Sequence, residues 1–68
     1  MSIEIGQSVT VKPSVESDLY ELEQIRDNAI VGTVYEIRTF EYTPNDIGVD
    51  FGKHGRWWFM EHEIEVRP

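Results

Sequence analysis

The chain has 68 residues, of which six are lysine or arginine, thirteen are aspartate or glutamate and none is cysteine. A domain of this size buries only about 60% of the surface that its unfolded chain exposes, so we expect a small net stability. The lack of cysteine excludes a disulfide framework and a thiolate zinc site, and it is typical of a reducing compartment. We therefore expect one domain over residues 1–68 that depends on its core alone and has no deep catalytic cleft.

Charge and hydropathy argue against two further classes of protein. The net charge is −7 and the six basic residues are scattered from Lys12 to Arg67, so we expect no direct binding to nucleic acid. The longest apolar run, residues 57–60, is far shorter than the ~20 residues that a membrane-spanning helix needs. Residues 1–4 also lack the basic start and apolar stretch of a signal peptide. We therefore expect a cytoplasmic protein without a membrane segment.

Five segments have the composition or the alternation of β-strands. Residues 7–12 alternate polar and apolar side chains and end at Pro13, and the second segment is rich in β-branched residues. The third and fourth segments are joined by a four-residue loop bounded by Gly52 and Gly55, which predicts a β-hairpin. The five predicted strands span residues 7–12, 30–38, 47–51, 56–60 and 64–67.

The long connection between the first two predicted strands has a different period. Leu19, Leu22 and Ile25 recur every three residues, and Asp18 with Glu21 has the spacing of a capping box. These features predict a helix of two turns that docks on the sheet by its apolar side. An irregular loop with the two leucines tucked inward is the alternative, and the sequence leaves both open.

The order and lengths of these elements are those of an SH3-like barrel. Five short strands are separated by one long early connection, a medium connection that ends in the turn signal at residues 43–46, and a tight hairpin. Closing a small sheet on itself protects its edges without many residues. We therefore predict an all-β fold, a small five-stranded SH3-like barrel whose long early loop, residues 14–28, holds either one short helix or irregular chain.

Four stretches of sequence carry a resemblance to known families: Ile5-Gly6-Gln7-Ser8-Val9-Thr10-Val11, Val31-Gly32-Thr33-Val34, Val49-Asp50-Phe51, and Phe59 followed by Glu63-Ile64. The chain is similar to small SH3-like barrels such as the variable chain of ferredoxin:thioredoxin reductase, the mind-bomb-type modules of ubiquitin ligases, and short proteins of bacteriophages and prophages. Its length and acidic charge are most similar to the phage and prophage members. The barrel is an accessory subunit in the reductase and recognises partners in the ligases, so the resemblance implies a role without catalysis.

Motifs for catalysis or metal binding are incomplete. A helical H-E-x-x-H pattern starting at His62 would need a second histidine where Val66 stands. None of the serines lies in a G-x-S-x-G elbow. Gly48 and Gly52-Lys53 give a phosphate-loop pattern that is one residue short and lies across a hairpin. We therefore predict a protein that is not an enzyme and has no catalytic residues, metal or cofactor.

The aromatic strand predicts the candidate contact surface. Neighbouring residues of a strand point to opposite faces, so Trp57 and Phe59 cannot face inward together with Trp58. The resemblance places Phe59 in the core, which leaves Trp58 outward as a rigid anchor for a partner. The alternative is that Trp58 covers the early loop by packing on Leu19 or Leu22. The predicted contact residues are Trp58, Tyr35, Phe40 and Tyr42, with charge contributed by Glu21 and Glu23.

These observations favour a small non-enzymatic protein-interaction module whose partner is a protein with a basic surface. Acidic side chains concentrate in the early loop and near the end of the chain. Two other functions stay open. An acidic nucleic-acid mimic that inhibits a host protein requires a continuous acidic stripe, which Arg26, Arg38 and Arg56 would interrupt. An accessory subunit of a larger enzyme requires a large apolar patch.

Overall fold

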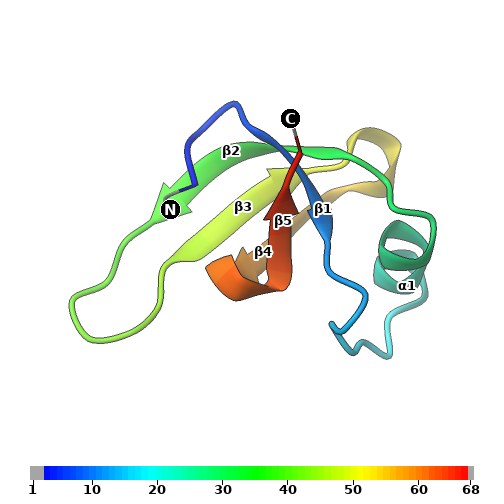
Figure 1. The fold of residues 1–68 in the computed structure, drawn as a ribbon, viewed down its shortest axis with the longest axis horizontal. Coiled ribbons are helices and arrows are strands. Elements are labelled where there is room, and N and C mark those ends of the chain that lie inside the picture. Colours follow the sequence, from blue (N-terminus) through cyan, green and yellow to red (C-terminus); the bar gives the residue numbers. More distant parts are fainter. Residues whose placement is uncertain (1–2, 68) are drawn as a thin grey trace.

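The computed structural model describes residues 3–67 and shows a small, mostly β fold with one short helix (Figure 1). All five strands are antiparallel and belong to one sheet with the order β4-β3-β2-β1-β5. No helix of this part of the chain is long and apolar enough to cross a membrane. The elements are β1 (Ser8–Val11), α1 (Tyr20–Asp27), β2 (Gly32–Arg38), β3 (Asp46–Asp50), the 3-10 helix η1 (Gly52–His54), β4 (Arg56–Met60), the 3-10 helix η2 (Glu61–Glu63) and β5 (Ile64–Val66).

Each predicted strand overlaps one observed strand, and the bounds of β4 agree with the predicted ones. The hairpin between β3 and β4 is also confirmed, with η1 as its connection. Gly55 has φ 90° and ψ −175° there, a conformation that is essentially restricted to glycine. Alternation, β-branched composition and the glycine-bounded turn were therefore sufficient to locate the strands.

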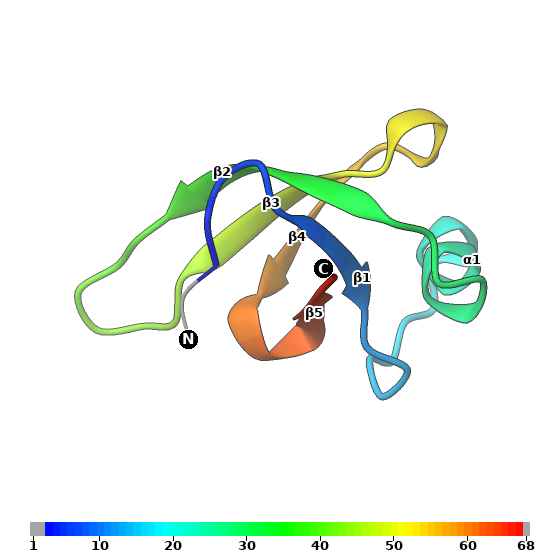
Figure 2. The same cartoon turned by 45° about the horizontal axis from the view of Figure 1, so that its top comes forward.

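The expected closure into a barrel is not found. In the described chain the sheet is open, and β4 and β5 are its two edges. One physical reason is that β5 has only three residues. Another is that the Met60 N–H, at the end of β4, donates to the Glu63 Oε1 at 2.7 Å and is not available for a closing ladder. A register shift between Val34 and Glu36 disrupts β2, and β1 and β5 run at a steep angle to β2 and β3 (Figure 2).

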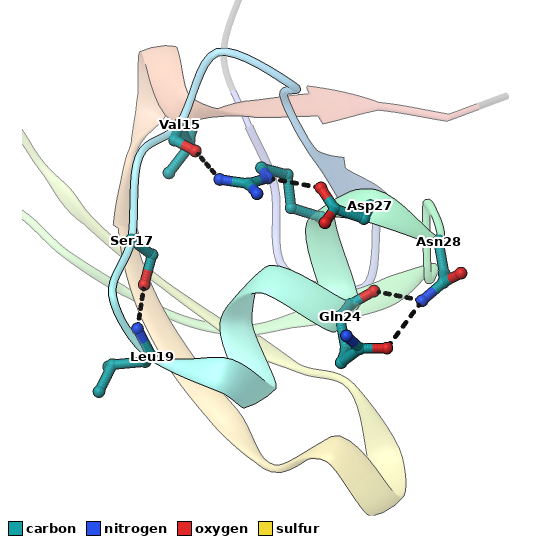
Figure 3. Close-up of polar contacts among 7 residues, drawn as sticks. Val15, Ser17, Leu19, Gln24, Asp27 and Asn28 are labelled. Carbon is teal, nitrogen blue, oxygen red and sulfur yellow. Dashed lines mark hydrogen bonds and ion pairs between the residues drawn. The ribbon is translucent and has the colours of Figure 1, made fainter.

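The early connection forms a helix, which settles the alternative that the sequence left open. Ile25 is fully buried and Leu22 packs against the core, but Leu19 is exposed because it precedes the first helical turn. The predicted capping box at Asp18 is wrong: Leu19 is the N-cap and makes no capping bond through its side chain. Ser17 instead accepts a hydrogen bond at its Oγ from the Leu19 N–H, at 3.1 Å (Figure 3).

One arginine joins the irregular part of the early connection to the helix. The Arg26 Nη1 donates to the Val15 carbonyl oxygen at 2.7 Å, and its Nε donates to the Asp27 Oδ1 at 2.9 Å (Figure 3). The hydrogen bond to Asp27 raises the pKa of Arg26 above its ordinary high value, so the guanidinium stays charged. This contact holds the chain before α1 against the helix without a side-chain cap.

The core is formed by side chains from all five strands, the hairpin and one residue of the helix. Gly32 packs against this core and leaves no room for a side chain, because an added Cβ would lie 2.6 Å from the Phe51 Cδ1 and from the Val49 Cγ1. The two phenylalanine rings of the core meet edge to face with centroids 6.1 Å apart. The buried apolar residues are Val9, Val11, Ile25, Val34, Ile47, Val49, Phe51, Phe59 and Ile64.

The helix ends in a Schellman motif with an unusual residue at its turning point. The Ile30 N–H donates to the Ile25 carbonyl at 3.0 Å, and the Ala29 N–H donates to the Arg26 carbonyl at 3.3 Å. Ala29 has φ 49°, in the left-handed region that favours glycine. An alanine there carries a strain of about 1 kcal/mol that glycine would not.

Ala29→Gly is therefore expected to stabilise the chain by about 1 kcal/mol, which raises the Tm by about 4–8 °C. Thermal unfolding followed by far-UV circular dichroism measures the change. Asn28→Gly is the control, because Asn28 has φ −98° and its side chain donates to the Gln24 carbonyl at 3.0 Å. Glycine should lower the Tm at position 28, and an equal effect of both substitutions would contradict the assigned backbone strain.

Candidate contact surface

Trp58 lies on the outer face of the sheet, with its neighbours turned inward. Phe59 is buried at 4% exposure, Trp57 packs against the core, and Trp58 is 40% exposed. The Trp57 indole N–H donates to the His54 carbonyl oxygen at 2.8 Å, which fixes this side chain at the hairpin. The predicted orientation of the three aromatic residues is confirmed, and Trp57 is the tryptophan that packs against the core.

Tyr35 on β2 packs against Trp58 on β4, across the intervening strand β3. The two ring centroids are 5.9 Å apart and the rings meet at 63°, close to an edge-to-face arrangement. Gly48 of β3 pairs with Trp58 and lies beneath both rings. An added Cβ at Gly48 would lie 3.0 Å from the Tyr35 Cζ and 3.1 Å from the Trp58 Cη2. The glycine therefore leaves room for the two rings to meet over β3.

Two arginines extend this pair of rings. The Arg38 Cζ lies 4.3 Å from the centroid of the Trp58 ring, and the Arg56 Cζ lies 4.7 Å from the centroid of the Tyr35 ring. Both distances are within the range of cation–π interactions. We call the group of Tyr35, Trp58, Gly48, Arg38 and Arg56 the Tyr35–Trp58 face. Because its own arginines already contact the rings, a cationic ligand would have to displace one of them.

Each arginine of the Tyr35–Trp58 face also has a carboxylate partner. The Arg38 Nε lies 3.0 Å from the Glu36 Oε2, and the Arg56 Nε lies 3.4 Å from the Asp50 Oδ2. All four side chains are at least one-third exposed, so these pairs add little stability on their own. Their main effect is to orient the guanidinium groups and to balance the charge around the rings.

A shallow groove of about 420 Å³ borders the face on the side of Tyr35. Its lining combines apolar and polar side chains, and Tyr35 belongs both to the groove and to the Tyr35–Trp58 face. A partner seated on Trp58 could therefore extend a side chain into the groove. The lining residues are Val31, Thr33, Tyr35, Asp50, Phe51 and Gly52.

The other four predicted contact residues lie outside the two strands that carry Tyr35 and Trp58. Phe40 is 49% exposed and Tyr42 is 90% exposed, both in the loop of residues 39–45 between β2 and β3. Glu21 and Glu23 are on α1, and this helix and the loop lie at opposite ends of the molecule (Figures 1 and 2). Of the six predicted residues, the structure thus brings together Tyr35 and Trp58 in direct contact.

Glu21 takes part in a different contact. Its Oε2 lies 2.6 Å from the Nδ1 of His54, which is in η1 at the tip of the hairpin. The contact becomes an ion pair when the imidazole is protonated. This polar contact joins the helix to the hairpin. The structure therefore gives Glu21 a role in holding α1 to the hairpin, which its sequence position did not indicate.

The arginines of the face were missed by the sequence reasoning, although a signal was present. Arg56 and Trp58 are two residues apart on one strand and therefore share a face. Glu36 and Arg38 have the same spacing on β2. The pairing register that brings Arg38 to Trp58 could not be read from one sequence, because it depends on the register shift in β2.

No protein-family model matches the chain, and no match is found among curated proteins or solved structures. Within residues 3–67, no group of three or more His, Cys, Asp or Glu side chains could hold a metal ion.

Gly48→Ala is expected to disturb the Tyr35–Trp58 contact and to lower stability by about 1 kcal/mol, the energy of one aromatic pair. The near-UV circular dichroism signal should weaken because both rings must move away from the added Cβ by a few tenths of an ångström. The same substitution in a Trp58→Ala background is the control, since the crowding is then partly relieved. An equal loss in both backgrounds would show that Gly48 does not act through Trp58.

Proposed function

We propose that the chain is a small non-enzymatic, cytoplasmic protein-interaction module with an SH3-like fold, similar to the short phage and prophage proteins named above. Its contact surface is the Tyr35–Trp58 face. The SH3-like part of the proposal is supported by the element order: a long early connection, a medium loop, a tight hairpin and a one-turn connection into the last strand. The role in binding rests on one observation, the rigidly held and exposed indole of Trp58.

The composition of the face suits binding to a protein. Tryptophan, tyrosine and arginine are the residue types most enriched at the energetic centres of protein interfaces. Tyr35 and Arg38 both contact the Trp58 ring and restrict its motion before binding. A partner that binds on this ring therefore costs Trp58 little side-chain entropy. A tryptophan that served packing alone would gain more by facing the core, as Trp57 does.

The distribution of charge favours an interaction module over a nucleic-acid mimic. A mimic needs a continuous row of acidic groups. Here Arg26, Arg38 and Arg56 each lie within 3.4 Å of a carboxylate oxygen, so positive charge interrupts the acidic surface at three places. The remaining excess of negative charge supports a partner with a basic surface, which would associate faster at low salt.

Capture of a partner from a host lysate tests the proposal. Trp58→Ala is expected to lose the captured protein while remaining folded, because it removes the anchor and leaves the core intact. Tyr20→Ala is the matched control, since Tyr20 is 73% exposed but lies on α1, away from the face. Unchanged capture by Trp58→Ala together with a lower Tm would make the aromatic pair a structural feature and contradict the proposal.

A further inference from the structure

The two edges of the open sheet differ in how well they are protected against pairing with another strand. β5 has three residues, and its central residue Glu65 is exposed, so self-pairing centred there would place two carboxylates opposite each other. β4 has five residues and contains no proline and no carboxylate, and it pairs with β3 without a bulge. The edge formed by β4 therefore has fewer of the features that prevent association than the edge formed by β5.

The backbone groups on the free side of β4 follow from the hairpin. The Phe51 N–H donates to the Gly55 carbonyl at 2.9 Å, which makes this pair a hydrogen-bonded one. Hydrogen-bonded and non-hydrogen-bonded pairs alternate along an antiparallel ladder, so Trp57 and Phe59 also direct their N–H and C=O groups toward β3. The residues that direct these groups away from β3 are Arg56, Trp58 and Met60.

An independent contact agrees with this assignment. The Met60 N–H is bound by the Glu63 carboxylate at 2.7 Å, which requires that it point away from β3. That contact also occupies the last donor of the edge. The donors and acceptors available for a further strand are therefore those of Arg56 and Trp58, both of which have exposed side chains.

We propose that β4 pairs antiparallel with β4 of a second copy of the chain, about a two-fold axis at Trp57. In this register Arg56 of each copy lies opposite Trp58 of the other. Each of these two pairs can exchange both of its backbone hydrogen bonds, so every available group of the edge is used. The bond between Met60 and Glu63 is kept, since Met60 takes no part in the pairing.

Side-chain chemistry selects a second copy as the occupant. Arg56 and Trp58 lie on the same outer face, so the pairing places the guanidinium of one copy across from the indole of the other, where it would displace Arg38 from the ring. This is the type of contact that Arg38 already makes with Trp58 and Arg56 makes with Tyr35. Because β4 has no acidic residue, no carboxylates oppose each other within the pair.

The net charge gives the association an unusual dependence on salt. Each copy carries −7, so two copies repel each other over distances comparable to the Debye length. Added salt screens this repulsion and should favour the dimer. Binding of a basic partner, as proposed above, should weaken under the same change. A short edge-to-edge contact is a small interface, and the dimer is therefore expected to form only at high protein concentration.

Analytical ultracentrifugation of the whole chain tests the inference at about 50 mM and about 500 mM salt. The average mass should rise toward twice that of one chain as protein concentration increases, and more so at the higher salt. Trp58→Lys should abolish the rise because it places a second cation opposite Arg56. Adding Arg56→Glu to Trp58→Lys should restore it, since the opposed groups then have opposite charge.

The far-UV circular dichroism spectrum and Tm of each variant show that it is folded. A wild-type chain that stays monomeric at all concentrations, a Trp58→Lys variant that still dimerises, or a double variant that stays monomeric would each overturn the inference. The inference concerns the backbone edge of β4 and does not rest on the proposed function. A monomer that still captures a protein through Trp58 would leave the proposed function standing, including the case in which that protein adds an extended strand to β4.

Discussion

Replacing Phe59 with alanine is expected to lower the free energy of unfolding by about 3–5 kcal/mol, the range found for buried aromatic residues. The whole domain has roughly 3–10 kcal/mol to lose, given about 0.05–0.15 kcal/mol per residue. Phe59 is 4% exposed and its ring meets that of Phe51 edge to face, so its loss leaves a cavity in the core. We expect this variant to be largely unfolded at physiological temperature.

Urea unfolding followed by far-UV circular dichroism measures this loss. Trp58→Ala is the control, because the two residues are adjacent on β4 but face opposite sides of the sheet. The control should lose only about 1–2 kcal/mol, the energy of one aromatic pair and one cation–π contact. If both substitutions were equally destabilising, Trp58 would be part of the structural core and its role as an exposed anchor would be wrong.

Ile25→Ala is expected to remove about 2–5 kcal/mol and to destabilise the sheet together with the helix. Ile25 is fully buried and is the one residue of α1 that belongs to the buried core cluster. An eight-residue helix has little stability of its own, so it persists only while this side chain is docked. Helix and sheet should therefore unfold in one transition.

Two spectroscopic probes distinguish this outcome from local fraying of the helix. Circular dichroism follows the backbone, and tryptophan fluorescence follows Trp57, which packs against the core from β4. Both midpoints should shift together in Ile25→Ala. Leu19→Ala is the matched control: Leu19 has the same three-residue spacing but is 55% exposed, so a change within about 0.5 kcal/mol is expected. A fluorescence midpoint that did not move in Ile25→Ala would show that the sheet is stable without the helix.

Local patterns were enough to predict most of the fold. Alternation of apolar residues or β-branched composition, together with the glycine-bounded turn, located the five strands and the hairpin. The orientation of Trp58 followed from the fact that neighbouring strand residues face opposite sides and that Phe59 was placed in the core. These features depend on residues close together in the sequence, so a single sequence is sufficient to predict them.

Features that depend on distant parts of the chain were predicted less well. Closure of the sheet was expected from the element order, but the short β5 and the hydrogen bond between Met60 and Glu63 leave the sheet open. The capping box at Asp18 failed because the helix begins after Leu19, and the chain before it is held by the hydrogen bond from Arg26 to the Val15 carbonyl oxygen. Neither outcome could be read from a local motif.

The candidate site shows the same division. Tyr35 and Trp58 are in direct contact, whereas Phe40 and Tyr42 lie in the loop after β2 and Glu21 lies on α1, at the opposite end of the molecule from that loop. Tyr35 reaches Trp58 because the register shift in β2 and the missing side chain at Gly48 allow the two rings to meet. Composition identified the right residue types, and the strand register decided which of them form a surface.

The two tryptophans of the chain provide the most direct test of the proposed contact surface. Each indole N–H gives its own signal in a nitrogen–proton NMR spectrum, and the Trp57 indole N–H is bonded to the His54 carbonyl oxygen. When a captured partner is added to isotope-labelled chain, the Trp58 signal should shift or broaden and the Trp57 signal should stay in place. A complex that forms while the Trp58 signal remains unchanged would contradict the assignment of the Tyr35–Trp58 face as the binding site.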